Sequence, residues 1–393
     1  MSHGRSRGTE PAPTFHLDAV RREFPILQER AYLNSCSLGA LSTRAEARLS
    51  DFLDAWHRMG AAAWYEHWLD AVETLRGRVA PFLGAETQEL ALLPSTSAAL
   101  SVVAESVDYS RRPKVITTEL DFPTVAYQWR VKPDAEVVVL PSHDGIGVDP
   151  EQFAEAVDER TAFLATGHVF FTTGFRQDLA RLAEIAHDAG AYCLIDGYQG
   201  AGQVPVDARG SGVDFYTAGP LKWMCGGPGL AYLYVREGLV ERLRPRITSW
   251  LAHQEPFAFE TDRFRPRPDA GRFELGTPAV PTIHTALGGQ EILEEVGIEA
   301  IAAWNRVLTD RLLDGLDAAG LPWLAPREPE ARTAIVMVEH PRAEAVVERL
   351  GERGIIVDHR AGYVRVSPHF YNTLEEVDRL VDELGRLSEG PSS

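Results

Sequence analysis

The chain has 393 residues, 45% of them hydrophobic and 24% charged, which is typical of a globular protein rather than a disordered or fibrous one. Its 39 basic and 57 acidic side chains give a net charge of −18, which argues against binding to nucleic acid or anionic membranes and favours a small-molecule partner. The three cysteines, Cys36, Cys193 and Cys225, suit neither a disulfide framework nor a metal site, so we expect no bound metal and a reducing, cytoplasmic environment.

The length favours two domains, because a single hydrophobic core rarely grows beyond about 250–300 residues. We expect a disordered polar tail over residues 1–14, a large domain over 15–285 and a small C-terminal domain over 286–393. The tail lacks the apolar segment of a signal peptide, and no apolar run is long enough to span a membrane. We therefore expect a soluble protein that is not exported.

Helical periodicity covers residues 45–83, and we interpret the stripe formed by Trp56, Trp64 and Trp68 as packing onto a core. From residue 92 onward, short apolar runs alternate with helical stretches such as 151–157 and 178–189. This alternation predicts an α/β domain with a mainly parallel sheet, helices on both faces and a ligand beyond the carboxyl ends of the strands. The predicted strands are 115–118, 137–140, 163–169, 192–195, 215–218 and 230–235.

Residues 250–272 form a long irregular excursion rich in Pro, Arg and Phe, which is typical of a functional or interfacial loop. A helix from about Thr282 to Val296 leads out of the large domain. The remaining pattern predicts a small α+β domain with strands near 334–338 and 363–366 and a closing helix from Leu374.

Two residues at the predicted carboxyl edge of the sheet suggest chemistry. Asp196 ends a strand, and a buried carboxylate there needs a cationic partner such as a protonated pyridine ring; taken alone, a turn-capping aspartate is the better interpretation. Lys222 precedes the glycine-rich segment 226–229, where desolvation favours a neutral amine that condenses with an aldehyde; a surface lysine is the plain alternative. Their occurrence after neighbouring strands favours a pyridoxal 5'-phosphate (PLP) site.

Six motifs that occur in a fixed order around these residues resemble class V of the fold type I PLP-dependent enzymes, and kynureninase most of all, over about residues 32–387. The resemblance implies a seven-stranded, mainly parallel sheet with a smaller α+β C-terminal domain. It also implies PLP on Lys222, an amino-acid substrate and a homodimer with active sites at the interface. The motifs are Tyr32–Gly39, Asp121–Thr124, His168–Gly174, Lys222–Gly229, Phe273–Pro278 and Arg365–Asn372.

The resemblance also implies roles for single residues around the cofactor. Thr96 and Ser97 would hold the PLP phosphate at a helix N-terminus, although a plain helix cap is at least as compatible with the sequence. Phe122 would stack on the ring of the cofactor, where a core phenylalanine is the default. Asp196 would pair with the ring nitrogen, and Gln199 would donate to the phenolic oxygen.

Three further residues would complete the site. Thr277 and Trp250 would reach the phosphate of the neighbouring subunit, with a turn hydroxyl and a core or interface aromatic as the alternatives. Arg365 would bind the substrate α-carboxylate, and a surface salt bridge is the ordinary alternative. Trp223, His253 and His369 are pocket candidates only because they lie near motifs.

Departures from the family patterns limit the reaction. Leu221 and Val125 replace a tyrosine and an aspartate of kynureninase, Gln199 replaces its histidine, and the segment 358–363 lacks the desulfurase cysteine. We therefore expect a lyase that cleaves a carbon–sulfur or carbon–carbon bond at the β-carbon of a cysteine-conjugate-like or kynurenine-like substrate. A class V aminotransferase or epimerase is the alternative, and a PLP-binding protein without catalysis is a third hypothesis.

Overall fold

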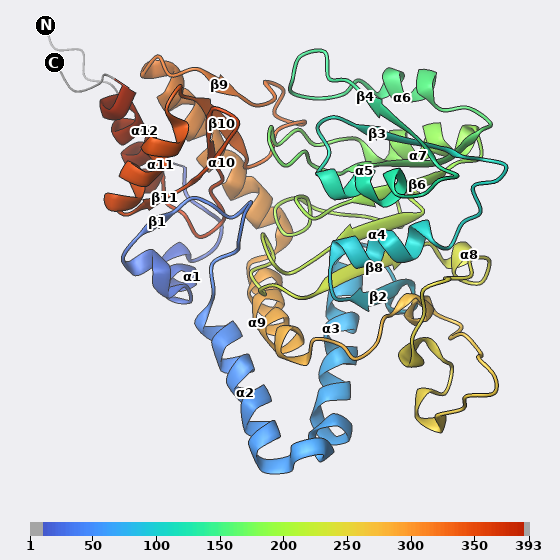
Figure 1. Ribbon diagram of the computed structural model, residues 1–393. Helices are drawn as coiled ribbons and strands as arrows, with labels where there is room; N and C mark the ends of the chain where they lie inside the picture. The colour runs from blue at the N-terminus through green and yellow to red at the C-terminus, as the bar shows by residue number, and fades with distance from the viewer. Residues whose placement is uncertain (1–10, 389–393) are drawn as a thin grey trace, which may run out of the picture.

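The computed structural model describes residues 11–388 (Figure 1). Of the tail expected over residues 1–14, positions 1–10 lie outside the described residues. The large core is a seven-stranded sheet in the order β2-β8-β7-β6-β5-β3-β4, in which β8 alone is antiparallel to its neighbours. The predicted mainly parallel sheet is thus confirmed. Its strands are β2 (Leu90–Leu93), β3 (Lys114–Thr118), β4 (Glu136–Leu140), β5 (Thr161–Gly167), β6 (Tyr192–Asp196), β7 (Phe215–Ala218) and β8 (Ala231–Val235).

Both faces of this sheet are covered by helices, so its central strands are buried along almost their whole length. Successive side chains of a strand point to opposite faces. Leu90 and Leu92 accordingly pack with α3 (Leu69–Phe82), α7 (Leu179–Asp188) and α9, whereas Ala91 and Leu93 pack with α4 and α5. The other helices of this domain are α2 (Thr43–Met59), α4 (Thr96–Ala104), α5 (Pro123–Arg130), α6 (Pro150–Ala156), α8 (Glu237–Val240) and α9 (Val280–Val296).

The residues 45–83 form two helices, α2 and α3, that run as a hairpin away from the sheet with α9 between them (Figure 1). A short π-helical stretch, Trp64–Trp68, joins the hairpin. The tryptophan rings do gather, with Trp64 and Trp68 centroids 5.2 Å apart and Trp56 and Trp68 centroids 6.2 Å apart. However, Trp56, near the end of α2, is 57% exposed, so the interpretation of the whole stripe as core packing is wrong.

The C-terminal part has its own core around an antiparallel sheet in the order β12-β13-β10-β9. The N-terminal segment bridges the two cores, because Phe24 packs in the large one while β1 (Ala31–Tyr32) pairs with β11 (Ile355–Ile356) of the small one. The N-terminal segment also contains α1 (Leu17–Arg22). The other elements of the C-terminal part are α10 (Ile298–Ala318), β9 (Trp323–Leu324), β10 (Val336–Glu339), α11 (Ala343–Glu352), β12 (Asp358–Arg360), β13 (Tyr363–Val366) and α12 (Leu374–Ser388).

The segment 250–272 is irregular, as expected, and contains only short 3₁₀ turns, at Trp250–Ala252, Pro256–Ala258 and Ala270–Phe273. Within residues 11–388, no helix combines the length and the apolar character that crossing a bilayer requires.

A buried ion pair ties the end of this excursion to the edge of the sheet. Arg76 of α3 donates from Nη1 to Glu274 Oε1 at 2.6 Å and to the carbonyl of Leu90, and Glu274 also accepts from the amide of Leu92. Both side chains are buried, so each charge depends on the other for its stability. The pair therefore fixes the segment 273–278 against β2.

We predict that Arg76→Met lowers the free energy of unfolding by about 3–5 kcal/mol, because it leaves the Glu274 carboxylate buried without a cation. The double variant Arg76→Met/Glu274→Gln should recover part of this loss, since glutamine still accepts from the amide of Leu92. Urea unfolding followed by circular dichroism measures both effects. A double variant no more stable than Arg76→Met would contradict the explanation.

Candidate active site

The predicted site residues lie where strands of the sheet end. Asp196 is the last residue of β6, Lys222 follows β7, Phe122 follows β3, and Thr96 begins α4 directly after β2. The four strands run parallel to one another, so their carboxyl ends meet at one edge of the sheet. The fold therefore places these residues on one side of the molecule although they are spread over 127 positions of the chain (222 − 96 + 1 = 127).

Lys222 differs from the other lysines of the chain. Lys114 forms an ion pair with Asp158 at 2.8 Å and Lys132 with Glu105, whereas Lys222 Nζ makes no ion pair or hydrogen bond within residues 11–388. Its Nζ lies 5.9 Å from the centroid of the Phe122 ring and 5.3 Å from that of Tyr198. The amine is therefore available to an incoming group.

Burial lowers the pKa of Lys222, opposed by Cys36 and Asp196 and assisted by the positive charges of Arg365 and Arg360. A lowered pKa increases the fraction of neutral amine, which is the form that attacks a carbonyl carbon. The environment of Lys222 thus favours the nucleophile over the ammonium ion.

Asp196 is buried, and within residues 11–388 it forms no ion pair. Its Oδ1 accepts from the amide of Tyr198 at 3.0 Å. Burial raises the pKa of Asp196, against the effects of that hydrogen bond and of the Lys222 charge. A buried carboxylate in this state gains most from a cationic donor, and a protonated ring nitrogen is such a donor.

The N-terminus of α4 leaves a phosphate-binding group free. The hydroxyl of Ser95, not that of Thr96 or Ser97, caps the helix by accepting from the amide of Ala98 at 3.2 Å. Thr96 Oγ1 is buried and has no hydrogen-bond partner, and the first amides of a helix have no intrahelical acceptor. These unpaired donors form an anion site.

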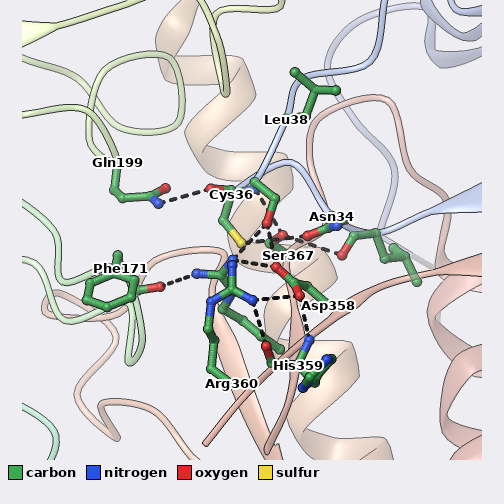
Figure 2. A network of polar contacts seen from close by, with 12 residues as sticks. Asn34, Cys36, Leu38, Phe171, Gln199, Asp358, His359, Arg360 and Ser367 are labelled. Carbon is green, nitrogen blue, oxygen red and sulfur yellow. Dashed lines mark hydrogen bonds and ion pairs between the residues drawn. The ribbon is translucent and has the colours of Figure 1, made fainter. Parts of the chain in front are cut away.

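Gln199 is held from two sides. Its Nε2 donates to the carbonyl of Cys36 at 3.0 Å (Figure 2). Its Oε1 accepts from Trp223 Nε1 at 2.7 Å. Because the indole only donates and the carbonyl only accepts, the orientation of the amide is fixed. Gln199 keeps a second N–H for a cofactor oxygen.

The three pocket candidates lie in different surroundings. Trp223 is fully buried, and its carbonyl accepts from His369 Nε2 at 2.8 Å. Burial lowers the pKa of His369 to about 3, so this ring is neutral and holds the backbone next to Lys222. His253 lies in the excursion, where its Nδ1 accepts from the amide of Glu255, and no contact joins it to Lys222 within residues 11–388.

The motif Tyr32–Gly39 contacts the backbone of the loop that carries Lys222. The amide of Gly39 donates to the carbonyl of Leu221 at 2.9 Å. A β-carbon on Gly39 would collide with the carbonyl oxygen of Lys222 and come within 3.0 Å of Cys225 Cα. Glycine is therefore required here, because the two backbones touch.

Arg365 is not a surface residue. Its side chain is 2% exposed, and it donates from Nη1 to the carbonyl of Phe171 at 2.9 Å and from Nη2 to Ser37 Oγ and Asp358 Oδ2 at 2.7 and 2.8 Å. Its Nε is buried without a partner. Asp358 also binds Arg360, and Figure 2 shows this pair close to Cys36, Phe171 and Gln199.

Several neighbours of Lys222 were not predicted. Tyr198, Ser37, Asp358 and Arg360 were missed. The segment 358–363 begins a β-hairpin of β12 and β13. The dipeptide Ala361-Gly362 was the available signal, since both residues adopt positive φ in a two-residue hairpin turn.

The two residues assigned to the neighbouring subunit lie apart from the others. Thr277 is exposed, and Trp250 is 40% exposed and packs against Phe257 with ring centroids 5.6 Å apart. Within residues 11–388, no hydrogen bond, ion pair or ring contact joins either one to the group around Lys222.

We predict that Gly39→Ala destabilises the protein by about 1–3 kcal/mol, because the added methyl group forces the Lys222 backbone to move. Gly351→Ala is the matched control, since Gly351 lies in α11 with open space around a β-carbon and should gain about 0.5–1 kcal/mol. Urea unfolding measures both. An unchanged Gly39→Ala stability would show that the two backbones are not in rigid contact.

These residues together fit PLP. The anion site at α4 suits its phosphate, the unpaired Lys222 its aldehyde, the buried Asp196 its ring nitrogen, and Phe122, 48% exposed, the face of its ring. The residues thus match the phosphate, the aldehyde and the ring nitrogen of the cofactor.

Comparisons with known proteins agree with this assignment. The family described as Aminotransferase class-V matches residues 40–380. An uncharacterized aminotransferase of Bacillus subtilis, YcbU, is 32% identical over 94% of this chain and 98% of its own. A kynureninase of Shouchella clausii is 30% identical, covering 92% of this chain and 90% of its own.

Among solved structures, the apo cysteine desulfurase of Thermococcus onnurineus superposes with a TM-score of 0.87 at 22% identity, covering 96% of this chain and 100% of its own. This likeness shows the fold. The chain therefore belongs to the class V aminotransferase family, as a fold type I enzyme whose cofactor is PLP.

Proposed function

We propose that the enzyme is a lyase that cleaves a bond at the β-carbon of an amino-acid substrate and holds PLP covalently on Lys222. The observation that carries this proposal is the buried, unpaired amine of Lys222 near both Asp196 and Arg365. The full-length likeness to kynureninase favours β-cleavage over the alternatives. The name of the Bacillus subtilis relative keeps an aminotransferase as the second candidate, with an epimerase as the third.

Each residue has a definite task in this proposal. PLP supplies an electron sink for bonds at the substrate α-carbon. Asp196 keeps the ring nitrogen protonated, Thr96 and Ser97 bind the phosphate, and Phe122 covers the ring. Gln199 donates to the phenolic oxygen. Lys222 Nζ, once the substrate amine has replaced it, accepts the proton from the α-carbon.

Arg365 binds the substrate α-carboxylate. Its unpaired Nε is a donor that a carboxylate oxygen satisfies, and a guanidinium suits bidentate binding. Because Phe171 and Ser37 hold the other nitrogens, the guanidinium plane is fixed before the substrate arrives. The α-carbon is thereby oriented relative to Lys222.

The side chains near Lys222 favour carbon–sulfur over carbon–carbon cleavage. Leu221 and Val125 cannot donate a proton, so no acid stands at these two positions, where kynureninase has a tyrosine and an aspartate. A thiol-type leaving group has a low pKa and departs as an anion near neutral pH, whereas a carbon leaving group needs protonation. We therefore place S-substituted cysteines ahead of kynurenines.

We also propose that two chains form the working unit. The exposure of Thr277 and Trp250 supports this, because both then remain available to the phosphate of a partner subunit. The ion pair of Arg76 with Glu274 would hold Thr277 in place for that contact.

We predict that Lys222→Ala abolishes the visible absorbance of covalently bound PLP and lowers the rate by about 10²–10⁴-fold, because the base at the α-carbon is lost. Lys114→Ala is the matched control, and it should keep the spectrum. Borohydride fixation followed by peptide mapping identifies the modified lysine. A label on Lys114 or Lys132 would reject the assignment.

We predict that S-substituted cysteines and water yield pyruvate, ammonia and a free thiol, and that kynurenine yields alanine slowly or not at all. Product analysis by mass spectrometry with single amino acids checks this. Accumulation of pyridoxamine phosphate with a keto acid would instead identify an aminotransferase. Exchange of the α-proton for deuterium without any product would identify an epimerase.

A further inference from the structure

The hairpin formed by β12 and β13 presents charged side chains on one face. Its register pairs Asp358 with Arg365 and Arg360 with Tyr363, and the two-residue turn at Ala361-Gly362 has φ values of 45° and 89°. Side chains two apart on a strand, and those directly opposite, share a face. Arg360 and Arg365 therefore both flank Asp358 on a rigid platform.

Asp358 is shared between the two arginines. Its Oδ2 accepts from Arg365 and from Ser37 Oγ at 2.8 Å each, and its Oδ1 accepts from Arg360 and from the amide of His359 at 2.7 Å each. Burial would raise the pKa of Asp358, but these hydrogen bonds and the two positive charges outweigh it and lower the pKa. The carboxylate is thus a stable anion, and Asp358, Arg360 and Arg365 together carry one net positive charge.

The excess charge lies near the reaction site. Arg365 donates to the carbonyl of Phe171, the Phe171 ring packs edge-on against Phe122 with centroids 5.3 Å apart, and the Phe122 centroid lies 5.9 Å from Lys222 Nζ. The charges of Arg365 and Arg360 add to burial in lowering the pKa of Lys222, although the whole chain carries a net charge of −18. Arg360 uses only Nη1, which donates to Asp358 and to the carbonyl of His359. Within residues 11–388 its Nε and Nη2 donate to no residue, and its side chain is 42% exposed.

We propose that Arg360 is a second anion-binding residue of the site, so that the preferred substrate carries a carboxylate or similar anionic group on its β-substituent besides its α-carboxylate. This inference rests on the proposed function, because it assigns the α-carboxylate to Arg365. The α-carboxylate on Arg365 balances the one net positive charge of the three side chains, and a second carboxylate on Arg360 satisfies its free Nε and Nη2 donors. If Arg360 served only to neutralise Asp358, its Nε and Nη2 donors would have no acceptor within residues 11–388.

The first test measures binding without turnover. Succinate and glutarate are compared with their half-amides, succinamate and glutaramate, by calorimetry on the holoenzyme; lacking an amine, none of them reacts with the cofactor. We expect at least one diacid to bind about 10-fold or more tightly than its half-amide. Arg360→Gln should remove this difference and Arg360→Lys should keep part of it, whereas Arg386→Gln, on α12, should leave it unchanged.

Equal affinities of diacid and half-amide in the unmutated protein would overturn the proposal. So would a persistent difference in Arg360→Gln. Circular dichroism of the Arg360→Gln holoenzyme should match that of the unmutated one, because Arg360 is half-exposed and within residues 11–388 its hydrogen bonds go only to Asp358 and the carbonyl of His359.

The second test uses turnover. S-carboxymethylcysteine and S-carbamoylmethylcysteine differ only in the charge at the end of the β-substituent. We expect Arg360→Gln to raise the ratio of KM for the first to KM for the second about 10-fold or more. If neither is cleaved, the proposed lyase activity fails, while the diacid comparison still decides the role of Arg360.

Discussion

The site depends on a lysine that is buried without a counter-ion. Desolvation lowers the pKa of an amine in that position, and the amine stays there only if the backbone on both sides of it is fixed. The fixing contacts come from distant parts of the chain. Gly39 lies on the Leu221–Lys222 backbone from the N-terminal segment, and His369 binds the carbonyl of Trp223 from the small domain.

This constraint explains why short polar and glycine-rich motifs far apart in the sequence behave as one unit. Gln199 accepts a hydrogen bond from the indole N–H of Trp223 and donates one to the carbonyl of Cys36, so it joins the lysine loop to the N-terminal segment. The N-terminal segment in turn pairs with the small domain through β1 and β11. The position of the lysine is therefore a property of the whole subunit rather than of its own loop.

The electrostatics of the site are opposite to those of the molecule. A chain with a charge of −18 repels anionic substrates at long range, so the anion sites must be local and preorganised. Two features supply them: the unpaired donors at the start of α4, and the hairpin that holds Arg365 and Arg360 around Asp358. Because Asp358 is fixed by four hydrogen bonds, the guanidinium groups keep their orientation in the absence of a substrate.

The sequence by itself determined the sheet and the candidate lysine. The alternation of apolar runs with helical stretches predicted six of the seven strands of the large sheet, and the strand ends pointed to Asp196 and Lys222, because period and strand position are local properties of the chain. Only the tertiary structure decided the rest. That Asp358 and Arg360 join Arg365, that the first segment pairs with the small domain, and that the tryptophan stripe leaves the core all depend on turns and long-range pairings. The pairing of β1 with β11 joins residues far apart in the sequence, which no local pattern encodes, whereas the hairpin of Asp358 and Arg365 depends on the turn at Ala361-Gly362.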